Sequence, residues 1–266
     1  MKEAFEFAKI TLRQSVRVKS FYGALIMTLV AIVGLFILHS FAMFEIPRIL
    51  MNYVLSYTNL IILLLVFLTF FSLIQYDIDK KTMQYIVALP MRRRDYILGR
   101  YFGLMAFSFI VSYGIVILFY PFLIILIKQR PDAPFSSIRY FLYPLFLLLE
   151  VSLISSFALL FTTLSTKSII SILSTLGVYF IGHSLDDVRE FILTGYGSDV
   201  PLFSKILIKT AWYLFPNLSV FDVKITMTYN LRFTLTEAFI IVGYGILYTV
   251  AILLITLSVF DKKEIL

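Results

Sequence analysis

Apolar residues along the chain are gathered into six long runs that polar segments separate. In chain order, the runs are residues 21–44, 56–76, 101–127, 140–163, 168–185 and 236–260. Most are long enough for a helix to cross ~30 Å of hydrocarbon at about 1.5 Å per residue. The fifth run is short and diluted by hydroxyl residues, but such a helix still spans where that side packs against other helices. The pattern predicts an all-α integral membrane protein with six transmembrane helices.

Residues 1–20 show a different pattern, in which charged and apolar positions fall on opposite sides of a helix. The charged stripe runs from Lys2 through Glu6 and Lys9 to Arg17, and apolar residues cover most of the other side. Such a helix is typical of the headgroup layer of a membrane, with its apolar face toward the lipid. A solvated N-terminal helix with one charged face is the alternative. The same residues lack the apolar segment of a cleavable secretory signal.

The longest connection, about 186–235, contains two apolar pieces that are too short to cross a membrane. They are Phe191–Leu193 and Phe203–Phe215, and Trp212 and Pro216 would anchor and end the second. We expect both to form short interfacial or re-entrant helices before the last span. The chain therefore divides into an interfacial helix at 1–20 and a transmembrane domain at 21–266.

Composition and charge agree with this assignment and add an orientation. Of the 266 residues, 60% are hydrophobic and 15% are charged, whereas soluble domains are about 25% charged. With the N-terminus placed in the cytoplasm, 14 of the 23 basic residues lie in the cytoplasmic segments and nine in longer external ones. Because cytoplasmic loops are enriched in lysine and arginine, both termini are expected in the cytoplasm, in a plasma or inner membrane. The net charge of +7 then reflects orientation and anionic lipid rather than nucleic acid.

The chain shows no motif for chemistry of its own. It has no Gly-rich phosphate loop ending in Gly-Lys-Ser/Thr, no cysteine, and only two histidines, His39 and His183, far apart in sequence. An ATP site, a metal cluster and a catalytic triad are therefore not expected. Any energy for uphill transport must therefore come from elsewhere.

Glu150 is the clearest ionisable residue inside a predicted span. A buried carboxylate costs several kcal/mol, so it either faces a translocation path or holds helices together through hydrogen bonds. The sequence leaves both roles open. His183, Asp186 and Asp187 gather at the end of the fifth span, where a solvated helix end is favoured over a binding site.

The segment 77–100 joins the second and third spans and carries six basic residues. Thr82 is placed to cap a short apolar helix that Pro90 ends, and an arginine cluster follows. Anchoring to anionic lipid explains the arginines but not the capped apolar helix.

Several residues of this segment make the chain resemble the ABC-2 type permeases, the transmembrane subunits of ATP-binding-cassette exporters. The matching positions are Asp79, Thr82, Leu89-Pro90, Arg93 and Gly99-Arg100. The amphipathic N-terminal helix and Tyr213-Leu214-Phe215-Pro216-Asn217 before the last span are also similar to that family.

The resemblance implies that residues 80–94 contain a coupling helix that docks on a separate ATPase subunit, which binds ATP and Mg²⁺. The docking residues would be Thr82, Tyr85, Ile86, Leu89, Pro90, Arg92, Arg93 and Arg94. Two permease chains, identical or related, would form the path between them. By analogy with the family, the first, second and fifth spans line that path. With Glu150, the candidate lining residues are Ser168, Ser171, Ser174 and Thr175.

The function expected on these grounds is ATP-driven export of a hydrophobic or amphipathic substrate. An ion-coupled secondary transporter that uses Glu150 is a second hypothesis, although such carriers usually show internal repeats and several intramembrane charges. A membrane scaffold that transports nothing, or a lipid-modifying enzyme, is a third, for which the sequence offers no catalytic set.

Overall fold

The computed structural model describes residues 2–79, 93–129, 134–165, 167–193 and 215–262. Five isolated residues, 203, 206, 209, 210 and 212, are also described, and all five are helical. Most of the predicted coupling helix lies outside these ranges, including Thr82, Tyr85, Ile86, Leu89, Pro90 and Arg92. Tyr213 and Leu214 lie outside them as well.

Helices account for nearly all of the described chain, and no strand occurs in it. They are α1 (Lys2–Arg17), α2 (Lys19–Phe41), α3 (Ile46–Asp79), α5 (Arg93–Gln129), α6 (Ser137–Leu164), α7 (Ser168–Leu193), the 3-10 helix η1 (Ser219–Phe221), α9 (Lys224–Thr228) and α10 (Leu235–Lys262). Six of them are long and apolar enough to cross a membrane: α2, α3, α5, α6, α7 and α10. The protein is an all-α, multi-span membrane protein, as the hydrophobic pattern predicted.

Each predicted run lies largely within one of these helices, but two boundaries differ. α3 begins at Ile46 rather than near residue 56, because Arg48 and Asn52 lower the hydropathy of a first part that is nevertheless helical. Ile46, Leu50 and Val54, spaced four apart, are fully buried, so one face of this part packs in the core. α7 continues to Leu193. The piece Phe191–Leu193 is therefore the end of α7 and not a separate helix.

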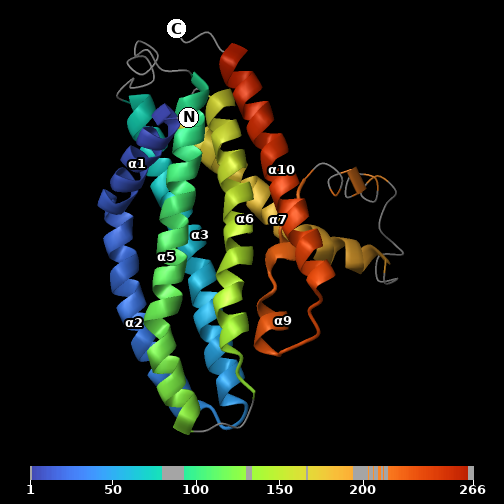
Figure 1. The fold of residues 1–266 in the computed structure, drawn as a ribbon. Coiled ribbons are helices and arrows are strands. Elements are labelled where there is room, and N and C mark those ends of the chain that lie inside the picture. The colour runs from blue at the N-terminus through green and yellow to red at the C-terminus, as the bar shows by residue number, and fades with distance from the viewer. Residues whose placement is uncertain are drawn as a thin grey trace.

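α6 lies at the centre of the bundle and contacts α3, α5, α7 and α10 (Figure 1). In its most apolar stretch 78% of the residues are buried, against 22% in α2 and 17% in α10. The outer helices thus present their apolar side chains to the surroundings, as helices facing lipid do. The first residues of α1 and the last of α10 lie toward the same end of the bundle (Figure 1), hereafter called the terminal end.

α1 packs against the first half of α5 at very short range, and two glycines make this possible. A Cβ atom added at Gly99 would lie 2.7 Å from Cβ of Phe7 and 2.9 Å from the carbonyl oxygen of Ala4. At Gly103 it would lie 2.5 Å from Cβ of Thr11. Small residues four apart let two helix backbones touch, as in membrane helix pairs.

Arg100, between these glycines, strengthens the same contact. Its guanidinium donates a 2.8 Å hydrogen bond to Oε1 of Gln14 and lies 5.4 Å from the ring centre of Phe7. The side chain is buried, so the cation is shared with α1 rather than with solvent. Gly99 and Arg100, two of the positions on which the family resemblance rests, therefore hold the N-terminal helix on α5. The location of α1 in a headgroup layer stays a prediction.

Candidate functional site

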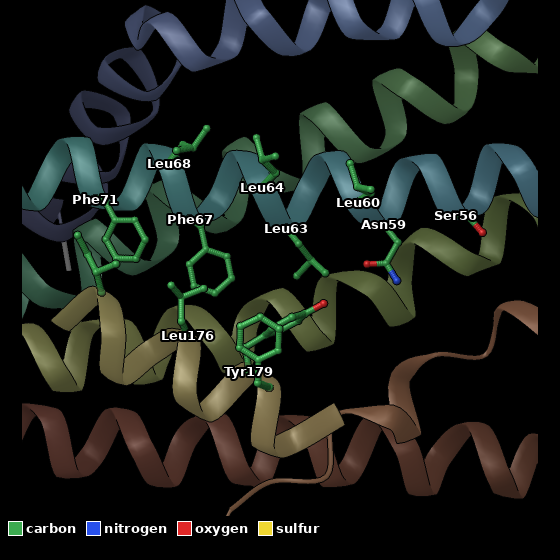
Figure 2. A pocket seen from close by; sticks show the side chains of 12 residues that line it. Ser56, Asn59, Leu60, Leu63, Leu64, Phe67, Leu68, Phe71, Leu176 and Tyr179 are labelled. Atoms are coloured by element: carbon green, nitrogen blue, oxygen red, sulfur yellow. The ribbon is translucent and has the colours of Figure 1, made fainter. Parts of the chain in front are cut away.

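An open groove of about 650 Å³ runs between α3 and α7. Its lining residues are Ser56, Asn59, Leu60, Leu63, Leu64, Phe67, Leu68 and Phe71 of α3 and Ile172, Leu176, Tyr179 and Phe180 of α7. Figure 2 shows the α3 residues in one row, with Phe71 at one end and Ser56 and Asn59 at the other. The volume is within the range of pockets that hold small organic molecules.

The groove is apolar because both helices turn a leucine- and phenylalanine-rich stripe toward it. The α3 positions recur at intervals of three and four residues, which keeps them on one side of a helix. Leu60, Leu64 and Phe180 are more than 40% exposed, so the groove opens sideways along the helices. An apolar molecule can enter it from the lipid phase.

One end of the groove is polar. Ser56 and Asn59 of α3 lie there (Figure 2), and the Asn59 side chain is hydrogen-bonded to Tyr143 of α6. Tyr179 of α7 lies further along the groove, with its ring 5.9 Å from that of Phe67. A ligand that fills the groove would thus meet apolar side chains over most of its length and hydrogen-bonding groups at one end. That arrangement suits an amphipathic molecule.

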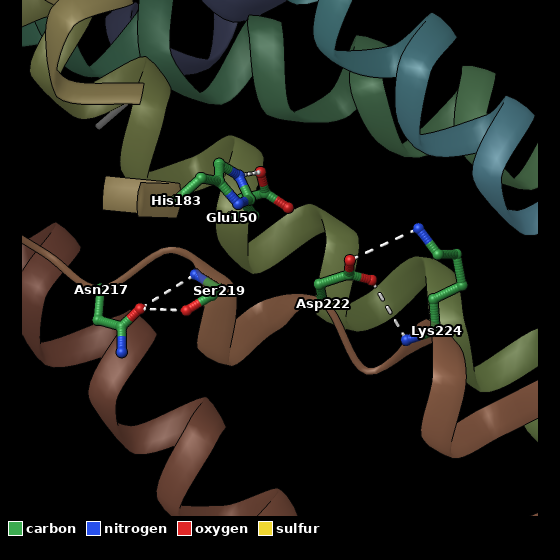
Figure 3. Close-up of polar contacts among 6 residues, drawn as sticks. All are labelled: Glu150, His183, Asn217, Ser219, Asp222 and Lys224. Atoms are coloured by element: carbon green, nitrogen blue, oxygen red, sulfur yellow. Dashed lines mark hydrogen bonds and ion pairs between the residues drawn. The ribbon is translucent and has the colours of Figure 1, made fainter. Parts of the chain in front are cut away.

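Beyond Tyr179, a hydrogen bond joins α7 to α6. The ring of Tyr179 meets the ring of His183 edge to face, with centres 4.7 Å apart. Nε2 of His183 lies 2.9 Å from Oε1 of Glu150 (Figure 3). Glu150 is 1% exposed and does not line the groove.

This hydrogen bond is the contact that the helix-holding role of Glu150 predicts, and a role of Glu150 in transport stays a prediction. A buried carboxylate with a hydrogen-bonded imidazole on the neighbouring helix fixes the position of α7 against α6. His183 is likewise more than a solvated helix end, since it contacts both Glu150 and Tyr179.

The chain between α7 and α10 folds back onto α7 at Gly182, the residue before His183. A Cβ atom added at Gly182 would lie 2.8 Å from the carbonyl oxygen of Pro216, and the amide of Leu218 donates to the Gly182 carbonyl at 3.1 Å. Only a residue without a side chain admits so close an approach. The Pro216-Asn217 pair, part of the stretch that resembles the family, is thus docked on the helix that lines the groove.

Asp186 secures this docked segment. Its Oδ2 atom accepts hydrogen bonds from Nδ2 of Asn217 at 2.6 Å and from Oγ of Ser219 at 2.8 Å. Ser219 also contacts Oδ1 of Asn217 (Figure 3). The hydroxyl of Tyr244 on α10 accepts from the Asn217 amide at 2.8 Å. Asp186 is therefore occupied by the segment before α10 rather than free in solvent.

Asp222 and Lys224 extend the polar region toward α9. Their side chains lie 3.5 Å apart, and the Lys224 backbone amide donates to Oδ1 of Asp222 at 3.3 Å (Figure 3). Among the described residues, no group of three His, Asp or Glu side chains is arranged to hold a metal ion. The hydrogen bonds and ion pairs of this polar region thus connect α6, α7 and the segment before α10 to one another. The residues that make these contacts are Glu150, His183, Asp186, Asn217, Ser219, Asp222 and Lys224.

The hydroxyl residues predicted to line a path lie on other sides of α7. Ser171 and Thr175 are fully buried, and the Thr175 hydroxyl donates to the Ser171 carbonyl at 2.7 Å. Ser168 and Ser174 are partly exposed, and none of the four lines the groove. Their proposed contact with a substrate stays a prediction.

The α7 residues that do line the groove were missed because they are apolar. They follow one another at intervals of four, three and one residues, which is the pattern of any packed helix face. These residues are Ile172, Leu176, Tyr179 and Phe180. Tyr179, an aromatic residue with a polar tip well inside a span, was the one available signal.

Serines that follow Glu150 on α6 do not extend a polar strip from it. Ser152 is hydrogen-bonded to Tyr101 of α5 at 2.5 Å and to Thr249 of α10 at 3.3 Å. Ser156 donates to the carbonyl of Leu153 at 2.7 Å. The Ser152 hydroxyl thus links α6 to α5 and α10, whereas Ser156 bonds the backbone of its own helix.

Of the predicted docking residues, Arg93 and Arg94 fall within the described chain, at the start of α5. Arg94 pairs with Asp261 near the end of α10, with Nη2 2.7 Å and Nε 2.9 Å from the same carboxylate oxygen. Its side chain is 66% exposed. A charge-reversing substitution of Arg94 would therefore also break this ion pair.

No model of a known protein family and no curated protein matches this sequence.

Proposed function

We propose that this chain is the permease subunit of an ATP-binding-cassette exporter of the ABC-2 type. The observation that carries this proposal is the open groove between α3 and α7, which are the second and fifth spans. In the family that the chain resembles, these two spans belong to the transport path. An apolar groove with one polar end favours a substrate with an apolar body and a hydrogen-bonding head.

ATP and Mg²⁺ would be bound by a partner ATPase, docked on the segment between Asp79 at the end of α3 and Arg93 at the start of α5. Both helices that flank this segment reach functional parts of the molecule. α3 forms one wall of the groove, and α5 is tied to α1 through Gly99, Gly103 and Arg100. A displacement of the docked segment would act on the groove wall and on a rigid α1–α5 pair together.

This role requires the terminal end of the bundle to face the cytoplasm and a second permease chain, identical or related, to complete the path. The high proportion of lysine and arginine in the predicted cytoplasmic segments supports that orientation. The exposed apolar faces of α2 and α10 are available to lipid or to the second chain.

The test is co-purification of an ATP-binding-cassette ATPase from the host cells with the tagged permease. Arg93→Glu combined with Arg94→Glu should abolish recovery of the ATPase while the permease still inserts into the membrane. Asp261→Asn is the matched control, because it breaks the Arg94–Asp261 ion pair and leaves both arginines in place. The control should retain the ATPase.

Undiminished recovery with the double variant would contradict docking at this segment. Loss of the ATPase with Asp261→Asn as well would show that the ion pair, and not a contact made by the arginines, is what the partner requires.

A further inference from the structure

A second pocket, of about 360 Å³, lies between α3 and the junction of α1 and α2. Its lining residues are Gln14, Arg17, Val18, Ser72 and Leu73. Nothing in the proposed transport function uses it. Most of its lining residues are polar or charged, in a molecule whose surface is otherwise dominated by apolar side chains.

The pocket lies at the border of the membrane-spanning part. The spanning stretch of α2 begins at Lys19, and the apolar run of α3 gives way to charged residues at Asp77. Val18 and Leu73, which line the pocket, therefore lie within about one helical turn of the level at which both helices leave the hydrocarbon. Lipid phosphate groups lie at this level.

Arg17 supplies a positive charge that no carboxylate of the described side chains neutralises. It takes part in none of the ion pairs formed by the described residues. A cation in the last turn of a helix is stabilised by the helix dipole. This stabilisation explains a basic residue at the end of α1, but it does not explain the pocket beside Arg17. A guanidinium with free N–H groups is well suited to bind phosphate oxygens.

The Gln14 side chain, which also lines the pocket, supplies a second donor. Its Oε1 atom accepts the hydrogen bond from Arg100, which leaves the NH₂ group of the amide as the remaining donor. α2 begins directly after Arg17 and Val18, and the start of this 23-residue helix adds a partial positive charge beside Arg17.

We propose that this pocket binds the phosphate group of an anionic phospholipid, with its acyl chains along the apolar surface of α2 and α3. Arg17 would bind the phosphate, and Gln14 would donate a second hydrogen bond. Because Gln14 is also bonded to Arg100 of α5, a bound lipid would brace α1 against both α3 and α5.

The experiment uses the purified full-length chain in detergent. Short-chain phosphatidylglycerol, phosphatidylcholine with the same acyl chains, and inorganic phosphate are titrated separately, and bound lipid is counted by native mass spectrometry. Arg17→Gln is compared with Arg13→Gln, which removes the same charge from an exposed position on the same helix that does not line the pocket. The melting temperature in phosphatidylcholine shows that each variant is folded.

We expect the wild-type chain to prefer phosphatidylglycerol, with an affinity about tenfold higher, the effect of one charge-assisted hydrogen bond. Arg17→Gln should remove this preference, Arg13→Gln should keep it, and inorganic phosphate alone should compete weakly. Equal losses in the two variants would overturn the assignment, because they indicate attraction by the general surface charge. A wild-type chain without the preference, or one that binds inorganic phosphate as tightly as the lipid, would overturn it as well.

Discussion

Two helix pairs in this bundle meet in opposite ways. α1 and α5 touch backbone to backbone at Gly99 and Gly103, and Arg100 bonds across the contact. α3 and α7 are held apart by leucine and phenylalanine side chains, which leaves an open groove between them. The size of the residues at a contact thus decides whether two helices form one rigid unit or leave room for a ligand.

The two contacts are supported differently as well. The α1–α5 contact is direct, whereas α7 owes its position largely to contacts behind the groove: Glu150 on α6, and the segment docked at Gly182 and Asp186. The two walls of the groove also meet directly, where the ring centres of Phe67 and Tyr179 lie 5.9 Å apart.

The largest effect is expected where the close contact is filled. Gly103→Ala would place a Cβ atom 2.5 Å from Cβ of Thr11 and 2.7 Å from the carbonyl oxygen of Ala8. Neither is the end of a flexible side chain, so α1 must move, at a cost of about 1–3 kcal/mol. The melting temperature of the purified chain should fall clearly.

Gly114→Ala is the matched control on α5, since an added Cβ atom there meets nothing within 4 Å. Its melting temperature should be unchanged or slightly higher, because alanine favours a helix over glycine. Similar losses in both variants would mean that α1 is not packed on α5 through Gly103.

A smaller effect is expected at the support of α7. Gly182→Ala would bring a Cβ atom within 2.7 Å of Cγ of Leu218 and 2.8 Å of the Pro216 carbonyl oxygen. The leucine side chain can move and the docked segment can partly yield, so the loss of stability should be less than for Gly103→Ala. Gly177→Ala, on the same helix with nothing within 4 Å, should leave the melting temperature unchanged. If the two variants melt alike, the segment is not held at Gly182.

The smallest effect is expected for Glu150→Gln, because a glutamine amide can keep the hydrogen bond to His183. Glu150→Leu removes that bond and should cost about 1–3 kcal/mol. Both melting temperatures and the ATP-dependent transport by the assembled complex are to be measured. Loss of transport in a stable, assembled Glu150→Gln variant would contradict the helix-holding role and favour a carboxylate that acts in transport.

Hydrophobic patterning was sufficient to predict the six spans and the helix before them, because runs of apolar residues and their periodicity are local features. Local patterns also identified Gly99 and Arg100 as part of a motif. They did not predict the contact of these two residues with α1. The start of α3 was predicted near residue 56 rather than at Ile46 because the prediction used local hydropathy, which Arg48 and Asn52 lower. The buried face of this first part of α3 is visible only in the tertiary structure.

The pairing of Glu150 with His183 was beyond sequence reasoning, because 33 residues separate them and nothing local indicates which helices meet. The α7 face that lines the groove was missed for a related reason. Hydroxyl residues such as Ser171 drew attention as polar groups, but serine and threonine in membrane helices often bond their own backbone, as Thr175 does. The groove itself is lined by residues that look like ordinary packing.

The most direct test of the central claim is the ATP-driven activity of the permease–ATPase complex when the groove is filled. Leu176→Trp puts a bulky ring into the groove, and Leu173→Trp, at a 64% exposed position on the same helix that does not line it, is the control. Both complexes should assemble in lipid nanodiscs. The groove variant should lose most of the permease-dependent ATP hydrolysis, and the control should keep it. Equal activity in the two complexes would contradict a transport role for the groove.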